Sequence, residues 1–309
     1  MAVDSISMRQ PLGVIGVPTS AGAFAPGQEG APVRLREAGL IELLRDSAVD
    51  VRDHGDRESW RWRPDRERPR AQNLDMVVEI VSHTARRVEE SALANEATLV
   101  LGGDCTVGIG TVAGHQGTGE RVGLVYFDAH ADLNIPKSVR EGALDWMGMA
   151  HMLGLPGTER ALVEAGSKAP LLEAEQVVLF SWDPVQATEH EPRAIERQSI
   201  DVIPLAQVAA DPPAAAKRAL ELLDDRADRM LVHFDVDVID FVDVPLSENP
   251  GRNEGLAYAD AVGALEALLG SPRVAGVTVT ELNPAHVEEG SGSIERLARD
   301  LAGAIGDNR

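Results

Sequence analysis

Two short segments of the chain combine residue types that bind metal ions. Residues Phe127–Asp132 read Phe-Asp-Ala-His-Ala-Asp, and residues His233–Asp237 read His-Phe-Asp-Val-Asp. Each segment continues an apolar run, and residues two apart on an extended chain point to the same side. One row of side chains would then hold Asp128, His130 and Asp132, and a second row would hold Asp235 and Asp237.

Four carboxylates that face one point repel each other strongly unless cations lie between them. Oxygen ligands with one imidazole suit manganese or a similar divalent ion, and this many carboxylates suit two bridged ions better than one. A single Asp-x-Asp pair is weak evidence, because aspartate is common in turns and caps. Two such clusters after two apolar strands make a metal site the stronger interpretation.

The composition of the chain indicates which binding partners and which cellular location to expect. A net charge of −21 over 309 residues argues against nucleic acid and anionic membranes, and it is compatible with a cationic substrate, although solubility alone explains it equally well. One cysteine excludes an internal disulfide. Met1–Gln10 lacks the apolar core of a signal peptide, so we expect a cytoplasmic protein.

Short β-branched runs alternate with helical patterns along the chain. The expected strands are Leu12–Val17, Ala97–Leu101, Val122–Phe127, Gln176–Phe180, Asp201–Pro204, Met230–Phe234 and Val274–Thr280, with another ending near Val51. The expected helices are Pro32–Leu44, Leu74–Ala94, Pro213–Leu223, Tyr258–Leu269 and Ile294–Ile305. This alternation predicts an α/β fold of three αβα layers around a mainly parallel sheet of about eight strands. No linker divides the chain, so we expect one domain over residues 1–309 with a surface loop at Arg57–Asn73.

The charged motifs all follow expected strands. Ligands of open parallel sheets bind at the carboxyl ends of the strands. Four motifs would therefore converge at one edge of the sheet: Gly102–Cys105, Asp128–His130, Asp235–Asp237 and Glu281–Pro284.

At these residues the chain resembles the ureohydrolase superfamily of arginases, agmatinases, guanidinobutyrases and formimidoylglutamases. The resemblance covers nearly the whole chain, through Gly16–Pro18, Gly27–Leu40, Asp53–Asp56, Gly102–Asp104, Asp128–Asp132, Phe234–Asp237 and Thr280–Pro284. It implies an arginase-like sheet, a binuclear Mn²⁺ site, hydrolysis of a small cationic guanidino substrate by a metal-bridging hydroxide, and assembly into trimers or hexamers.

The resemblance also implies a role for each metal-binding residue. Asp128 and Asp235 would bridge the two ions, and Asp132 would bind the first ion. His130 and Asp237 would bind the second ion.

Other motif residues would contact the substrate. Asp128, Asp237 and Glu281 are the implied catalytic residues, with Asp237 relaying a proton to the leaving amine and Glu281 facing the guanidinium. Asn134 resembles the arginase residue that holds the substrate's α-carboxylate, and Asp183 aligns with an acidic residue that faces its amino group.

The chain departs from the family at the first ion. Cys105 stands where the family has a metal-binding histidine, and a soft thiolate matches hard manganese poorly. This ion could bind weakly or be another divalent metal. Some relatives that hydrolyse Nω-hydroxyarginine resemble this chain in having cysteine there. The alternative is that Cys105 is simply a small buried residue.

Two further departures concern the substrate. Glu141 stands where arginases have a serine that touches the α-carboxylate, so it either points away or selects substrates without that charge; a solvated loop residue is the alternative. Met147 replaces a proton-shuttling histidine, and His151 nearby is expected to be structural. His233 should face the same side as Asp235.

The sequence therefore predicts a metal-dependent amidinohydrolase. The expected substrate is L-arginine or Nω-hydroxy-L-arginine, which would give urea or hydroxyurea and an amine. Two alternatives stay open: an agmatinase or guanidinobutyrase that needs no α-carboxylate, and a non-catalytic binding protein with this fold. Retention of the clustered carboxylates argues against the second.

Overall fold

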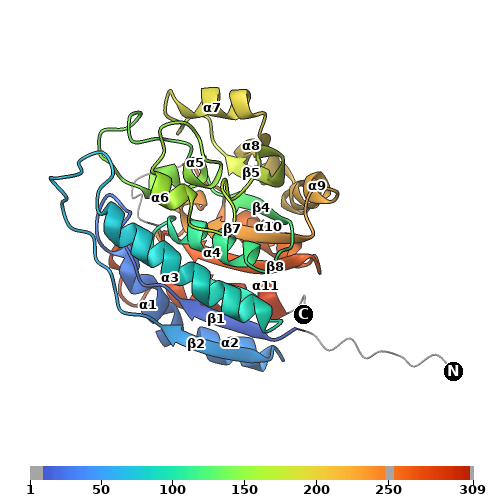
Figure 1. Ribbon diagram of the computed structural model, residues 1–309. Coiled ribbons are helices and arrows are strands. Elements are labelled where there is room, and N and C mark those ends of the chain that lie inside the picture. The colour runs from blue at the N-terminus through green and yellow to red at the C-terminus, as the bar shows by residue number, and fades with distance from the viewer. Residues whose placement is uncertain (1–9, 248–253, 307–309) are drawn as a thin grey trace.

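Eight parallel strands form one sheet in the computed structural model, which describes residues 10–247 and 254–306 (Figure 1). The strands are β1 (Leu12–Gly16), β2 (Val51–Asp56), β3 (Ala97–Leu101), β4 (Val122–Phe127), β5 (Val177–Trp182), β6 (Asp201–Pro204), β7 (Arg229–Asp235) and β8 (Val274–Thr280). Their order is β2-β1-β3-β8-β7-β4-β5-β6, and every pair is parallel. The predicted α/β fold is confirmed, although Val51 begins a strand rather than ending one.

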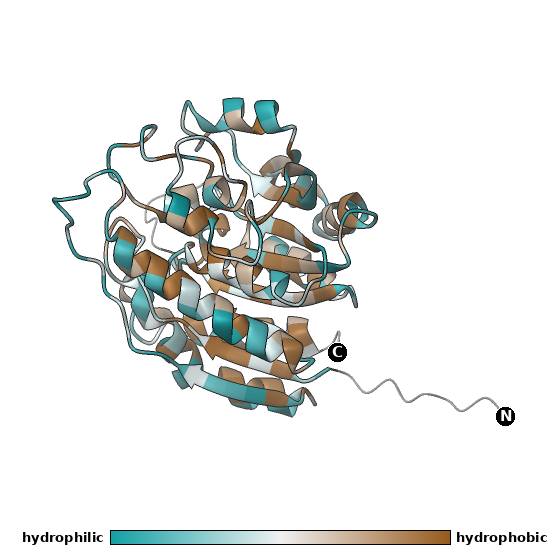
Figure 2. Cartoon of the chain, in the orientation of Figure 1, coloured by the Kyte–Doolittle hydropathy of each residue, from teal (hydrophilic) through white to brown (hydrophobic). Residues whose placement is uncertain are grey.

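Helices cover both faces of the sheet. They are α1 (Ala31–Glu37), α2 (Leu40–Asp46), α3 (Leu74–Leu93), α4 (Val107–Gln116), α5 (Gly148–Met152), α6 (Arg160–Val163), α7 (Glu191–Gln198), α8 (Leu205–Ala210), α9 (Pro212–Leu223), α10 (Tyr258–Leu269) and α11 (Ser293–Gly306). One apolar cluster joins the sheet to α1, α2, α9, α10 and α11, and another joins its other face to α3, α4 and α5. Apolar residues accordingly concentrate in the strands and on the inner sides of the helices (Figure 2).

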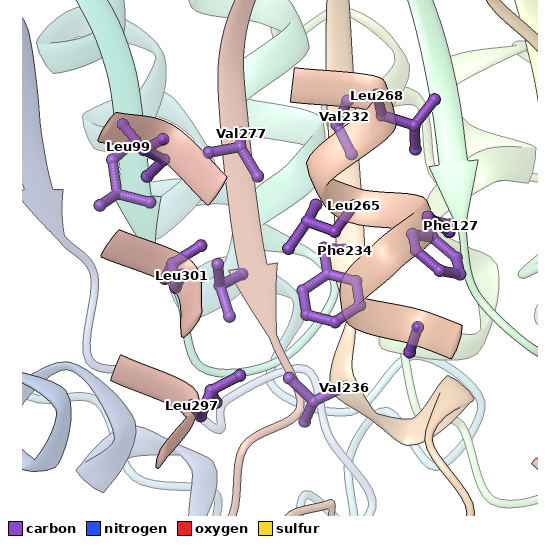
Figure 3. Close-up of a cluster of buried hydrophobic side chains, with 14 of the residues drawn as sticks. Leu99, Phe127, Val232, Phe234, Val236, Leu265, Leu268, Val277, Leu297 and Leu301 are labelled. Atoms are coloured by element: carbon purple, nitrogen blue, oxygen red, sulfur yellow. The ribbon is translucent and has the colours of Figure 1, made fainter. Parts of the chain in front are cut away.

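The strands contribute alternate residues to the two cores. In β4, Val125 and Phe127 pack on the α10 side, whereas Leu124 and Tyr126 pack on the α4 side. The α10 side holds a group of aromatic and branched residues around Phe127 and Phe234 (Figure 3). Because the six strands between the edge strands β2 and β6 are buried on both faces, their side chains can leave the core only at their ends.

Two differences from the predicted helices have local causes. Gly39 adopts a left-handed conformation (φ 83°) and divides the expected helix at Pro32–Leu44 into α1 and α2. Helix α4 was not predicted because all its residues are buried, so it lacks the polar face that marks an amphipathic helix. Residues Arg57–Asn73 form the expected loop, without helix or strand.

No helix within the described residues has both the length and the apolar character needed to span a membrane. The first nine residues of the Met1–Gln10 segment, where no signal peptide is expected, lie outside the described residues.

Candidate metal centre and substrate cavity

Four neighbouring strands bring the charged motifs together. Strands β3, β8, β7 and β4 are adjacent in the sheet, and at or just after their carboxyl ends lie Cys105, Glu281, Asp235 and Asp128. The register pairs Phe127 with Phe234, so the aspartates that follow them lie on adjacent strand ends. The predicted convergence of these motifs is therefore observed.

Cys105 lies in a turn that the side chain of the preceding residue, Asp104, stabilises. The buried carboxylate of Asp104 accepts hydrogen bonds from the backbone N–H of Thr106 (3.0 Å) and of Gly22 (3.0 Å). The Cys105 backbone N–H in turn donates to Oε1 of Glu281 (2.9 Å). The turn thus fixes the thiol and the Glu281 carboxylate relative to each other.

The first donor group, here called the Cys105 cluster, comprises Cys105, Asp128, His233 and Asp235, all buried. The thiol Sγ lies 2.9 Å from Oδ2 of Asp235 and 3.2 Å from Nε2 of His233. Burial lowers the pKa of His233 to about 3, so its imidazole is neutral, as a metal ligand must be. The expectation that His233 faces the same side as Asp235 is confirmed.

The second donor group, the His130 cluster, comprises Asp128, His130 and Asp237. Nδ1 of His130 lies 3.2 Å from Oδ1 of Asp128 and 3.1 Å from Oδ2 of Asp237. Asp128 belongs to both clusters, as expected of a bridging ligand, whereas Asp235 falls only in the Cys105 cluster.

The electrostatics of these residues fit cations. Burial, and next the charge of Asp237, raise the pKa of Asp128 to about 6 and the pKa of Asp235 well above its usual range. Oδ2 of Asp128 is buried and accepts no hydrogen bond from the residues that the structure describes. Placing carboxylates so close is costly unless cations compensate them. The donors of the two clusters therefore fit two divalent ions.

Asp132 was expected to bind the first ion, and that role stays a prediction. Its Oδ2 accepts a hydrogen bond from the hydroxyl of Tyr126 (2.5 Å), and it is absent from both donor clusters among the described residues. Asp132 still lines the cavity beside the clusters.

A cavity of about 470 Å³ opens onto both clusters. Its wall is made by Phe24, Ala25, Cys105, His130, Asp132, Asn134, Asp145, Trp146, Gln186, Thr188, Glu191, Asp235, Asp237, Glu281 and His286. Glu281 is held there by Cys105 N–H and by Nε2 of Gln28, which donates to Oε2 (3.1 Å). Phe24 stacks on Trp146, with ring centroids 5.9 Å apart, to form an aromatic part of this wall.

The structure separates the three residues that were expected to hold the far end of the substrate. Asn134 lines the cavity, and its Oδ1 accepts from Thr188 Oγ1 (2.8 Å). Asp183 lies just behind the wall, where its Oδ2 accepts from Nε2 of Gln186 (3.1 Å). Glu141 is exposed outside the wall, and its carboxylate accepts the backbone N–H of Arg140. Glu141 therefore fits the solvated-loop alternative.

Met147 and His151 occupy a buried corner near the cavity. Nδ1 of His151 donates to the Met147 carbonyl oxygen (2.7 Å), and Nε2 accepts the Glu159 backbone N–H (3.1 Å). Both ring nitrogens are thus bound to backbone, as expected of a structural histidine.

Sequence reasoning missed several residues of the cavity wall, including Phe24, Asp145, Trp146, Thr188 and Glu191. Most of these residues come from connections whose paths no periodic pattern reveals, and Glu191 is the first residue of the short helix α7. Asp145 and Trp146 had a nearby signal, since they directly precede Met147 and the Gly148-Met149 pair that resembles the family's motif. Burial, and then Glu281, raise the pKa of Asp145 well above its usual range.

Comparisons with known proteins agree with this geometry. The model of the Arginase family matches residues 10–305. The arginase of Bacillus caldovelox is 29% identical over 278 residues, which cover 89% of this chain and 91% of that protein. Its solved native structure has a TM-score of 0.85 at 27% identity and covers 97% of this chain and 99% of that one. Formimidoylglutamase from Bacillus subtilis shares the fold, with a TM-score of 0.76 at 17% identity and coverage of 97% and 87%.

The chain therefore belongs to the arginase family, whose members are metal-dependent amidinohydrolases. The predicted family resemblance is confirmed.

Proposed function

We propose that the protein hydrolyses a guanidino compound of the L-arginine or Nω-hydroxy-L-arginine type, giving urea or hydroxyurea and an amine. The observation that carries this proposal is the pair of donor clusters that share Asp128, because each cluster also places two of its residues on the wall of the cavity: Cys105 and Asp235 from one, His130 and Asp237 from the other. Two divalent ions held there would supply an activated water and would neutralise developing charge, with manganese expected in the His130 cluster.

The protein's own residues would orient the substrate and move the proton. Glu281 is fixed by Cys105 and Gln28, and its charge complements a guanidinium in the cavity. Asp237 lies on the same wall beside His130 and would pass a proton from the attacking water to the leaving nitrogen. Asn134, supported by Thr188, would hold the polar far end of the substrate.

One observation favours a second candidate, a guanidino amine without an α-carboxylate. Five carboxylate side chains besides Asp235 line the cavity, those of Asp132, Asp145, Glu191, Asp237 and Glu281. No lysine or arginine accompanies them among the described residues of this wall. Such a wall attracts a second positive charge and offers no cation to a carboxylate.

A substrate panel tests the proposal. Urea and hydroxyurea release would be measured after incubation with manganese, using L-arginine, Nω-hydroxy-L-arginine, agmatine and 4-guanidinobutyrate. We expect turnover of an α-amino-acid substrate, and turnover of agmatine alone would establish the second candidate. An Asp237→Asn variant is the control for contaminating activity. Metal-bound protein that turns over no member of the panel would contradict both candidates.

A further inference from the structure

We propose that His233 is a direct ligand of the metal ion in the Cys105 cluster, and that the thiolate–imidazole pair suits this position to a zinc-like ion rather than to manganese. The inference rests on the proposed two-ion centre, but it concerns which residues and which metal make up one half of it. The family resemblance gave this half the bridging Asp128 and Asp235 together with Asp132 and the position of Cys105, and it assigned no metal to His233.

The donors lie within hydrogen-bond distance of one another, so small outward shifts of the side chains would let them share an ion. Nε2 of His233 lies 3.2 Å from the thiol Sγ, and Sγ lies 2.9 Å from Oδ2 of Asp235. With zinc bonds of about 2.3 Å to sulfur and about 2.1 Å to nitrogen, two ligands of one tetrahedral ion lie roughly 3.5 Å apart. Asp128 completes the set, because its ligand oxygen lies within 4.8 Å of all three other donor atoms.

The imidazole of His233 is held in this orientation from three sides. Its ring stacks on Tyr126 with centroids 4.5 Å apart and an interplanar angle of 10°. Nε2 also lies 3.1 Å from the Thr280 hydroxyl. On helix α4, Gly108 leaves the space that Nδ1 occupies, since a Cβ there would lie only 2.7 Å from that nitrogen. The surroundings therefore aim Nε2 at the thiol.

Tyr126 also contacts Asp132, the carboxylate that lies outside the Cys105 cluster. The tyrosine hydroxyl donates to Asp132 Oδ2, while the tyrosine ring supports His233 on its face. One residue thus binds the carboxylate of Asp132 through its hydroxyl and supports the imidazole of His233 with its ring.

The resulting donor set is one sulfur, one nitrogen and carboxylate oxygen. Thiolate and imidazole are preferred by zinc, whereas manganese prefers oxygen. On binding, the thiol of Cys105 would release its proton to solvent as the ion enters, because the ligand is the thiolate. The His130 cluster lacks sulfur and keeps the oxygen-rich set that suits manganese.

Cobalt(II), which replaces zinc and reports its ligands, is the probe for the full-length protein. We expect a thiolate-to-cobalt charge-transfer absorption that Cys105→Ser abolishes. In protein labelled with ¹⁵N-histidine, two paramagnetically shifted, exchangeable ring N–H signals are expected, one from His130 and one from His233. This count requires no substitution of His233, so it decides the question even if a variant fails to fold.

Two matched histidine variants test how much His233 contributes to the metal affinity of the Cys105 cluster. His115 is a second buried histidine, and its Nε2 lies 2.9 Å from the Thr98 hydroxyl, outside the donor clusters of the described residues. His233→Leu should weaken cobalt and zinc binding at the Cys105 cluster roughly tenfold or more, whereas His115→Leu should change it less than about twofold. Because zinc outcompetes manganese at most sites, the ion preference is read from the zinc-to-manganese affinity ratio, which should fall in His233→Leu only.

The outcomes separate the inference from the proposed function. A charge-transfer band with only one shifted histidine signal would overturn the role of His233 while leaving the two-ion centre intact. An unchanged zinc-to-manganese ratio in His233→Leu would overturn the ion preference. Failure of cobalt to bind either cluster would remove the proposed function and the inference together.

Discussion

The two halves of the acidic centre differ in their donors and their surroundings. The Cys105 cluster joins sulfur, nitrogen and oxygen donors, all of them buried, with Tyr126 and Thr280 packed against it. The His130 cluster has one imidazole between two carboxylates, and the His130 side chain is 19% exposed toward the cavity. Both clusters reach the cavity wall, but the Cys105 cluster is the more enclosed of the two.

The two halves meet at Asp128, which offers an oxygen to each cluster. A change there should therefore affect both ions, whereas a change confined to one half should affect one. The following predictions use this distinction, from the largest effect to the smallest.

Asp128→Ala should have the largest effect. We expect loss of both ions and at least a roughly thousandfold fall in kcat/KM, because the shared ligand is removed. Asp237→Ala should also impair activity, but it should retain the ion of the Cys105 cluster. Metal content per chain, measured by mass spectrometry after dialysis, distinguishes the two variants.

The fold of Asp128→Ala should survive. Removing a buried carboxylate with a raised pKa relieves a cost that the metal-free protein otherwise bears at neutral pH. Circular dichroism of both metal-free variants is the control. An Asp128→Ala protein that keeps one full ion per chain would show that the halves are independent.

A second prediction concerns a buried histidine that belongs to neither half. Burial lowers the pKa of His151 to about 4, below its unfolded value of 6.5, and its protonation would break the bond from Glu159. The stability from the neutral ring is therefore complete above about pH 6.5 and is lost as pH falls toward about 4, by up to about 3 kcal/mol.

In His151→Gln, the free energy of unfolding should no longer show the loss at low pH that comes from protonation of His151. The free energy of unfolding would be measured by urea denaturation at neutral pH and near pH 4, with partly exposed His190→Gln as the reference variant. Metal content should not change in either variant. If His151→Gln lost an ion, burial alone would no longer distinguish a structural histidine from the proposed ligand His233.

The sequence predicted the sheet and the convergence of motifs because strands buried on both faces leave unmistakable β-branched runs. Asp128 and Asp235 follow such runs directly, and Cys105 follows one after the short turn Gly102–Asp104, so their place at the sheet edge could be inferred. The position of Asp132 could not, because it depends on the hydroxyl of Tyr126, which the apolar pattern of β4 presents only as a core residue.

The other features that could not be predicted belong to elements without a periodic sequence pattern. Helix α4 is buried on all sides, so no amphipathic pattern marks it, although its Gly108 leaves room for His233. The cavity wall at Phe24, Trp146 and Thr188 depends on the paths of connections between strands and helices, which are set by tertiary contacts.

The smallest effect is expected from a substitution of Cys105, whose sulfur is the donor that most distinguishes the two clusters. Cys105→His should raise the manganese affinity of the Cys105 cluster about tenfold, because imidazole suits manganese better than thiolate does. Cys105→Ser is the matched control, since it removes the sulfur without adding a nitrogen. Manganese titration followed by electron paramagnetic resonance gives the affinity of each cluster. If Cys105→His and wild type bound manganese equally, the thiol would not set the metal preference, and the contrast between the halves would have to arise from burial alone.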